Sequence, residues 1–191
     1  MLPLSDSALS NDDRHALLVR ARQAIVEIVL HRRIADFPPA AGRLAAPGSA
    51  FVTVHCFSKL RGCIGRTDPS LPLAETVVQC AISAALHDPR FAPLDPADIP
   101  SLEIEISVLS EMAPISPLAI EPGKHGLVVI QGTRRGLLLP QVAVEHHWSA
   151  DRFLAETCKK AGLDGDACLD PETKILAFTA DVFSETELPP A

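Results

Sequence analysis

The chain has 191 residues, of which 47% are hydrophobic and 21% charged, the composition of a globular protein with a sizeable core. A net charge of −7 with only 17 Lys and Arg residues argues against nucleic-acid and anionic-membrane partners, because phosphate binding needs concentrated cations. No run approaches the roughly 18 to 20 apolar residues of a membrane span, and five cysteines without a C-x-x-C pair predict reduced thiols in a cytoplasm.

The N-terminal part of the chain predicts a helix followed by a loop. Ser10-Asn-Asp-Asp13 resembles a capping box, and apolar residues then recur at helical spacing. We expect Pro38-Pro39 to end this helix, because proline cannot continue it. Residues 40–49, rich in Pro, Gly and Ala, are expected to form a loop.

The middle of the chain predicts a β-hairpin and a second helix. Ala50–Phe57 is rich in β-branched and aromatic residues and predicts a strand. We expect Ser58-Lys59 to form a tight turn that returns the chain through Leu60–Gly65, although an Asn-Gly or Asp-Gly signal is missing. Pro72 suits the first position of a helix, which must end near His87-Asp88 because a proline follows.

The remaining chain predicts further strands and one more helix. Leu102–Leu109 alternates apolar and polar residues and predicts a strand with one solvated face. A hairpin is expected from strands at 127–131 and 136–139. Ser149 is a suitable cap for a helix that runs to about Ala161 and is closed by Gly162, and the last strand is expected at 174–183.

This order of elements predicts an α+β fold, with an antiparallel sheet, helices packed on one of its faces, and two lobes. Proline-rich stretches predict a small inserted lobe at about residues 66–100 within a domain that spans residues 13–185. Residues 1–12 and 186–191 are expected to be flexible tails. The sequence has no G-x-G-x-x-G motif and no P-loop, and it leaves the identity of any cofactor unknown.

The segment Leu60-Arg-Gly-Cys-Ile-Gly65 has the composition of a site. Its two glycines allow another backbone or a ligand to approach closely. Arg61 and Arg66 are cations that favour the thiolate form of Cys63 if it is partly exposed. We therefore expect a ligand here, with Cys63 as candidate nucleophile and His55 or His125 as candidate base. The candidate ligand-binding residues are Arg61, Gly62, Gly65, Arg66, Gln141 and Trp148.

Each of these candidates has a structural alternative. For Cys63 the sequence favours a small residue that packs in a tight strand or shapes the ligand site over a nucleophile, since free cysteines are often buried and a nucleophile needs a positioned base. Arg90 is expected to be a structural partner of Asp88 rather than a ligand clamp. Glu103 and Glu105 share one face of a strand, which favours a solvated surface over a metal site, so no metal is predicted.

A series of short motifs follows one order along the chain: Phe51-Val-Thr53, Leu60–Gly65, Asp88-Pro-Arg-Phe91, Glu103–Leu109, Gly126-Leu-Val128, Gly136–Val142, Trp148, Phe153-Leu154, Cys158–Leu163 and Phe183-Ser-Glu185. In these motifs the chain resembles the AMMECR domain family, also called AmmeMemoRadiSam system protein A. The resemblance implies an α+β protein of two lobes, of undetermined activity, and many prokaryotic members resemble components encoded beside a Memo-like protein and a radical SAM enzyme. One departure is Cys168, where similar proteins usually carry an aromatic residue.

Two functions follow as hypotheses, and the sequence leaves both open. The first is an enzyme, or a subunit of one, that modifies a small molecule or peptide with Cys63 and Arg61 in a glycine-lined cleft. The second is a non-catalytic binding or adaptor module that presents a groove to a partner enzyme or carries its substrate, with Cys63 merely small.

Overall fold

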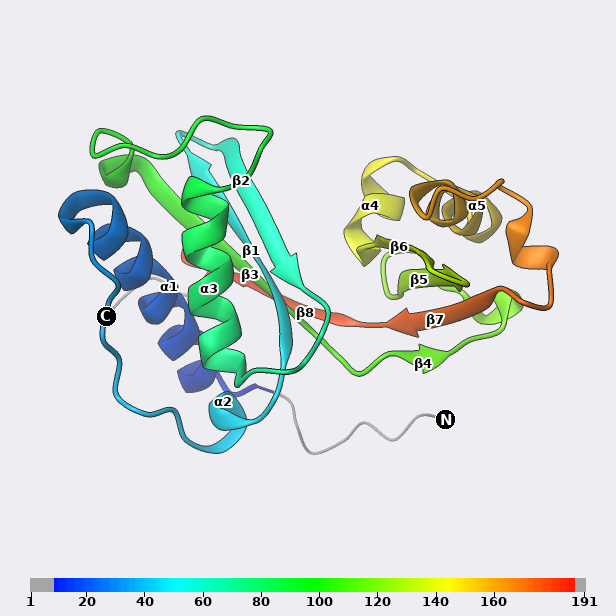
Figure 1. Ribbon diagram of the computed structural model, residues 1–191, viewed down its shortest axis with the longest axis horizontal. Coiled ribbons are helices and arrows are strands. Elements are labelled where there is room, and N and C mark those ends of the chain that lie inside the picture. The colour runs from blue at the N-terminus through cyan, green and yellow to red at the C-terminus, as the bar shows by residue number, and fades with distance from the viewer. Residues whose placement is uncertain (1–8, 188–191) are drawn as a thin grey trace. The chain divides into compact units, whose positions relative to one another are not determined.

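The computed structural model describes residues 9–187 and divides them into two compact units. Unit 1 consists of the residues up to Val108 together with those from Asp181 onward, and unit 2 consists of Leu109–Ala180. Each unit has its own antiparallel β-structure and helices (Figure 1). The predicted α+β class is therefore confirmed.

Unit 1 begins with α1 (Asn11–His31), whose start matches the prediction. The Asp13 amide donates to Ser10 Oγ at 3.1 Å, and the Ser10 amide donates to Asp13 Oδ2 at 3.0 Å. The helix ends well before the prolines, because Arg32 adopts a left-handed conformation (φ 56°) and its amide turns back to Glu27. Two residues of the expected N-terminal tail belong to this helix, and residues 1–8 and 188–191 of the expected tails lie outside the described residues.

The sheet of unit 1 has the strand order β2-β1-β3-β8, so β2 and β8 form its edges. Helices α1 and α3 pack against one another and cover one face of this sheet (Figure 1). The buried face of β1 and the apolar faces of both helices share one hydrophobic core. The remaining elements of unit 1 are α2 (Gly42–Ala45), β1 (Ser49–Cys56), β2 (Lys59–Arg66), α3 (Leu73–Leu86), the 3-10 turn η1 (Ile99–Ser101), β3 (Leu102–Leu109) and β8 (Ala180–Ser184).

The β1–β2 hairpin turns one residue earlier than expected. Phe57 and Ser58 form a two-residue turn, and both have positive φ angles, 50° and 58°. This geometry is that of a type I′ turn, which favours Asn-Gly because side chains strain the left-handed conformation. The sequence has no Asn-Gly pair at this point, and the predicted position of the turn, Ser58-Lys59, was therefore wrong by one residue.

The sheet of unit 2 has the strand order β4-β7-β5-β6. Its β5–β6 hairpin closes through the two residues Gly132 and Thr133 rather than the four expected. The cap of α5 is confirmed, since Ser149 Oγ accepts from the Arg152 amide, and Gly162 follows the helix with φ 73°. The elements are β4 (Ala113–Pro114), η2 (Pro117–Ala119), β5 (Gly126–Gln131), β6 (Arg134–Leu138), α4 (Pro140–Glu145), α5 (Ala150–Lys160), η3 (Ala167–Leu169) and β7 (Lys174–Phe178).

The single strand predicted at residues 174–183 is divided into two strands, β7 and β8, which belong to different sheets. β7 belongs to the sheet of unit 2, and β8 to that of unit 1. Between them, the Thr179 carbonyl accepts from the Ser110 amide at 2.9 Å. The boundary of the lobes also differs from expectation, because residues 66–100 include α3, which packs against α1, β1 and β2 within unit 1.

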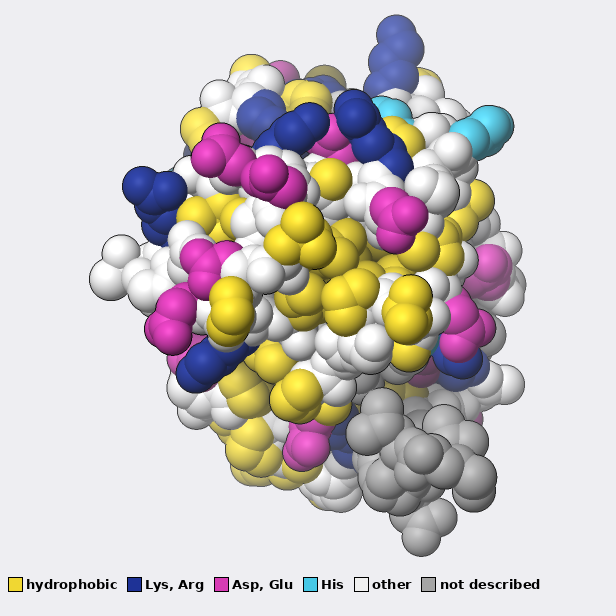
Figure 2. Space-filling model, turned by 90° about the vertical axis from the view of Figure 1, so that its right-hand side faces the viewer, with side chains coloured by type: hydrophobic (Ala, Val, Ile, Leu, Met, Phe, Trp, Pro, Cys, Tyr) yellow, Lys and Arg dark blue, Asp and Glu magenta, His cyan; other side chains and the backbone are white. Residues whose placement is uncertain are grey.

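The surface mixes apolar and charged side chains. Within residues 9–187, no helix has both the length and the hydropathy to cross a lipid bilayer. Figure 2 shows hydrophobic side chains in the middle of one face, with acidic and basic side chains around them. Unit 2 exposes Leu118, Val144 and Leu169, and unit 1 exposes Phe57 at the tip of its hairpin.

Candidate functional site

Cys63 lies on β2 and faces away from the helices. It pairs with Thr53 of β1, whose strand neighbours Val52 and Val54 point into the core. The Thr53 hydroxyl donates to the Cys63 sulfur at 3.4 Å. Cys63 is half-buried. Cys80 of α3 is instead fully buried, and this burial raises the pKa of its thiol to about 11. Cys63 therefore has the exposure that a reactive thiol requires.

The two glycines beside Cys63 are explained by packing within the chain. Gly62 lies on the helix side of β2, and a Cβ atom there would be 2.0 Å from the carbonyl oxygen of Ala84 in α3. A Cβ atom on Gly65 would be 2.2 Å from the ring of Phe51. The close backbone approach expected at this segment is thus made by α3, and these glycines do not by themselves indicate a ligand.

Asp88 and Arg90 cap the free edge of β2 at Cys63. The Cys63 amide donates to Asp88 Oδ2 at 2.9 Å, and Arg90 Nη2 donates to the Cys63 carbonyl at 3.2 Å. These contacts satisfy backbone groups that an edge strand would otherwise leave unpaired. Arg90 also holds Asp88 through Nε (2.9 Å) and Nη2 (2.7 Å), which is the structural role expected for it.

The Asp88 carboxylate is buried, with 4% of the residue exposed, and it is held in its charged form. The hydrogen bond from Arg90 is the main cause that lowers the pKa of Asp88 well below its usual range, and the Cys63 amide adds to it. Asp88 was not among the residues predicted for the site. The Asp-Pro-Arg-Phe motif marked the segment, but only the fold shows that it meets Cys63.

Arg61 and Arg66, the two cations expected beside the Cys63 sulfur, hydrogen-bond with other side chains. The β1–β2 register shifts between Val54 and His55, so Arg61 is the extra residue of a β-bulge, and its Nη1 pairs with Asp98 Oδ1 at 2.6 Å. Arg66 donates to Gln79 Oε1 and to Ser70 Oγ, each at 3.1 Å. Arg90 instead meets Cys63 at its backbone carbonyl, and the pKa of Arg90 is raised chiefly by Asp88 and further by Cys63.

The candidate bases do not bond the thiol. Within residues 9–187, the hydrogen-bond partner of the Cys63 sulfur is Thr53 and not a histidine. His55 follows Thr53 by two residues on β1 and pairs with Leu60. His125 belongs to unit 2, where its Nδ1 atom accepts from the Glu121 amide at 3.0 Å.

The other predicted site residues of unit 2 have local contacts. Gln141 lies in α4, half-buried. Trp148 stacks on His146 with ring centroids 4.6 Å apart and packs against the core of unit 2. In unit 1 the structure therefore brings together Cys63, Thr53 and Arg90. In unit 2, Trp148 has a packing role beside His146.

Comparison with known proteins decides the family. The AMMECR1 family model matches residues 18–183. The chain belongs to the AMMECR1 family. It is 43% identical to a protein of Aeropyrum pernix over 97% of this chain and 84% of that relative, and 41% identical to a protein of Methanothermobacter thermautotrophicus over 93% and 96%.

A solved AMMECR1 relative confirms the fold. The crystal structure of the uncharacterized protein PH0010 from Pyrococcus horikoshii superposes with a TM-score of 0.82, at 39% identity over 90% of both chains. None of these relatives carries a name that states an activity. Family membership therefore establishes the fold of this AMMECR1 protein, and its chemistry has to be argued from its own residues.

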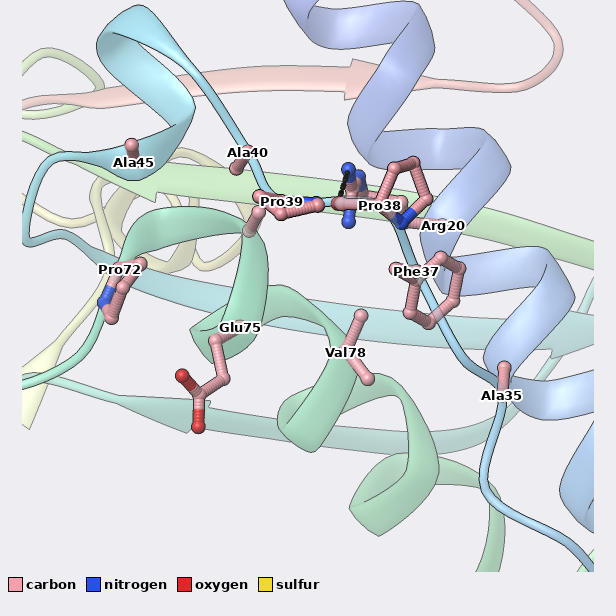
Figure 3. Close-up of a pocket in the computed structure, with 11 residues that line it drawn as sticks. Arg20, Ala35, Phe37, Pro38, Pro39, Ala40, Ala45, Pro72, Glu75 and Val78 are labelled. Carbon is pink, nitrogen blue, oxygen red and sulfur yellow. Dashed lines mark hydrogen bonds between the residues drawn. The ribbon is translucent and has the colours of Figure 1, made fainter.

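One cavity of this AMMECR1 chain lies in unit 1, away from Cys63. It has a volume of about 480 Å³ and opens between the segment after α1 and the start of α3 (Figure 3). Arg20 closes one side, donating to the Pro38 carbonyl at 2.8 Å and lying over the Phe37 ring. The residues described, 9–187, contain no group of three or more His, Cys, Asp or Glu side chains suited to a metal.

Proposed function

We propose that this AMMECR1 protein binds a small molecule or peptide on the outer face of the β1–β2 hairpin, with the Cys63 thiol as its reactive or contacting group. The observation that carries this proposal is the half-buried sulfur of Cys63, which accepts from the Thr53 hydroxyl in a residue whose carbonyl accepts from the Arg90 guanidinium. A hydroxyl donor can hold the sulfur in one orientation, and a nearby cation can attract an electrophile that carries negative charge.

The electrostatics of the site suggest the class of ligand. The Arg90 side chain is 57% exposed, so the guanidinium that holds Asp88 also faces solvent. An electrophile with a carboxylate or phosphate group gains from such a cation. Because no described histidine bonds the thiol, the sulfur would depend on Thr53 and Arg90 rather than on a paired base.

Alkylation of the native protein tests this proposal. Cys63 and Cys168 are the two half-buried thiols, so the two must be followed separately, and a free peptide thiol is the reference. The tryptic peptide 62–66 reports Cys63 alone. We expect Cys63 to react with iodoacetamide several-fold faster at pH 7 than a free peptide thiol, and the isosteric Thr53→Val variant to slow it. A rate no higher than that of the peptide would refute a reactive thiol.

Two alkylating reagents of different charge test the role of Arg90. Iodoacetate carries a carboxylate and iodoacetamide does not, so the ratio of their rates measures attraction to a nearby cation. We expect the ratio at Cys63 to fall several-fold in Arg90→Gln and to stay unchanged in Arg66→Gln, whose guanidinium binds Gln79 and Ser70 instead. Equal ratios in both variants would show that Arg90 does not act on the sulfur.

The pathway of this protein is a further part of the proposal. The family resemblance supports a shared pathway with a Memo-like protein and a radical SAM enzyme, and the thiol site is where a substrate of that pathway would bind. Co-purification of the three proteins, with Cys63→Ala as the comparison, tests this. If the three proteins co-purify equally well with the Cys63→Ala variant, the surface that contacts the partner proteins is distinct from the thiol site that would bind the substrate.

A non-catalytic adaptor is the second candidate function, and one observation favours it. The glycines beside Cys63 are required by Ala84 and Phe51, so their presence needs no ligand. In that case Cys63→Ala would leave both partner binding and pathway output intact. Loss of output with retained partner binding would instead support the thiol site.

A further inference from the structure

Unit 2 contains two cysteines that the chain brings together, Cys158 on α5 and Cys168 on η3. After α5, Gly162 adopts a left-handed conformation (φ 73°), and the Leu163 amide donates back to the Cys158 carbonyl at 3.0 Å. The chain then runs back along the helix, where a Cβ atom on Gly165 would lie 3.6 Å from Cβ of Ala155. This reversal places η3 against α5.

The two thiols are neighbours. η3 packs against α5, both cysteines belong to one hydrophobic cluster, and Cys168 lies close enough to act on the pKa of the Cys158 thiol. Both residues also pack in the core of unit 2, beside Phe153 and Leu154. Cys158 is fully buried and Cys168 half-buried, so a reagent in solution can reach only the second of them directly.

We propose that Cys158 and Cys168 form a redox-reactive pair, in which Cys168 is the accessible thiol and Cys158 resolves its mixed disulfide. A low-molecular-weight disulfide, such as oxidised glutathione, is the oxidant. The Cys168 thiolate attacks one sulfur of that disulfide, forms a mixed disulfide and releases one thiol. The Cys158 sulfur then attacks the Cys168 sulfur and releases the second thiol, so two protein thiols are oxidised and one disulfide is reduced to two thiols.

The order of the two steps follows from the surroundings of each thiol. Burial raises the pKa of Cys158 to about 11, so this residue is protonated at neutral pH and shielded from an external oxidant. It becomes the attacking group only when its neighbour carries the mixed disulfide. The pair is independent of the proposed role of Cys63, which lies in unit 1.

The test uses the full chain and oxidised glutathione. After incubation, free thiols are blocked with N-ethylmaleimide, and tryptic peptides are identified by mass spectrometry without reduction. We expect the peptide 153–159 to be joined to the peptide 161–174 in the majority of molecules, with both cysteines protected from N-ethylmaleimide. Dithiothreitol should restore both thiols.

Variants separate this pair from other thiols. Cys168→Ser changes a half-buried position and should abolish the link, leaving Cys158 reduced, while Cys63→Ser should leave the link in place. The inference is overturned if glutathione remains on Cys168 of the wild-type protein with Cys158 still reduced. It is overturned equally if Cys168 stays unmodified or is joined to a cysteine of unit 1.

Discussion

The contact between Asp88 and the edge of β2 can be tested with the substitution Asp88→Asn. The carboxylate accepts two hydrogen bonds at each oxygen. Oδ2 accepts from the Cys63 amide and from Arg90 Nη2, and Oδ1 accepts from the Arg90 amide and Nε. An asparagine keeps one acceptor oxygen, so two donors face an NH₂ group whichever way the amide is turned.

The magnitude follows from these two lost acceptors. A buried donor without an acceptor costs about 1–3 kcal/mol. The Cys63 amide and Asp88 are shielded, but the Arg90 side chain is 57% exposed, so water can replace part of what the guanidinium loses. We therefore expect Asp88→Asn to lower the free energy of unfolding by about 3 kcal/mol, toward the lower part of the summed range.

Urea denaturation followed by far-UV circular dichroism measures this loss. The matched control is Asp68→Asn, because Asp68 is 71% exposed and lies 3.9 Å from Arg66. An exposed pair of this kind contributes little, so the control should change stability by less than about 0.5 kcal/mol. A loss below about 1 kcal/mol in Asp88→Asn, or an equal loss in both variants, would refute the importance of the edge contact.

The same carboxylate predicts how stability depends on pH. Its folded-state pKa lies below its unfolded value, so its contribution is fully present above about pH 4 and is lost as the pH falls toward the folded pKa. The difference in stability between the wild type and Asp88→Asn should therefore be constant from pH 5 to 7 and shrink below about pH 4. A difference that grows on acidification would contradict a carboxylate held in its charged form.

Three further substitutions test the packing and the turns. Gly62→Ala should lower the free energy of unfolding in urea by more than about 2 kcal/mol, since its Cβ would meet the backbone of α3. The control is Gly165→Ala, whose Cβ would have contacts of 3.4 Å or more and which should change stability by less than about 0.5 kcal/mol. Similar losses in both variants would argue against the close approach of Gly62 to α3. Replacing Phe57-Ser58 with Asn-Gly should raise the thermal midpoint by a few degrees, as about 1 kcal/mol of turn strain is relieved, and a lower midpoint would count against a type I′ turn. Ser149→Ala should cost about 1 kcal/mol through loss of the α5 cap, and an unchanged urea midpoint would show that the cap contributes nothing.

Local patterns predicted the elements whose signals lie within their own residues. The strand Leu102–Leu109 matches the structure at both ends, because its alternation stops where the strand stops. The α1 and α5 caps were also identified, since Ser10 and Ser149 bond backbone amides only three residues away. The division of residues 174–183 was missed, because the apolar alternation continues across Thr179 and does not show that the strand changes sheets.

The candidate site was predicted in its location but not in its contacts. The sequence pointed to Cys63, yet its partner Thr53 depends on the register of the hairpin, which the turn residues did not reveal. Arg61 adjoins Cys63 in sequence, but the bulge directs it to Asp98. Arg90, 27 positions away from Cys63, is the cation that reaches it, because the segment after α3 returns to the edge of β2.

The Leu60–Gly65 segment therefore combines two separable kinds of constraint. Gly62 must leave room for α3, and the backbone of Cys63 must hydrogen-bond with Asp88 and Arg90. Any small side chain at position 63 would be compatible with both requirements. Nothing in this packing requires a sulfur atom. The sulfur nevertheless lies on the exposed side of the sheet with a hydroxyl donor beside it, where a serine or alanine would satisfy the fold equally well. The case for chemistry at this position thus depends on the side chain of Cys63, and the case for the fold depends on its backbone.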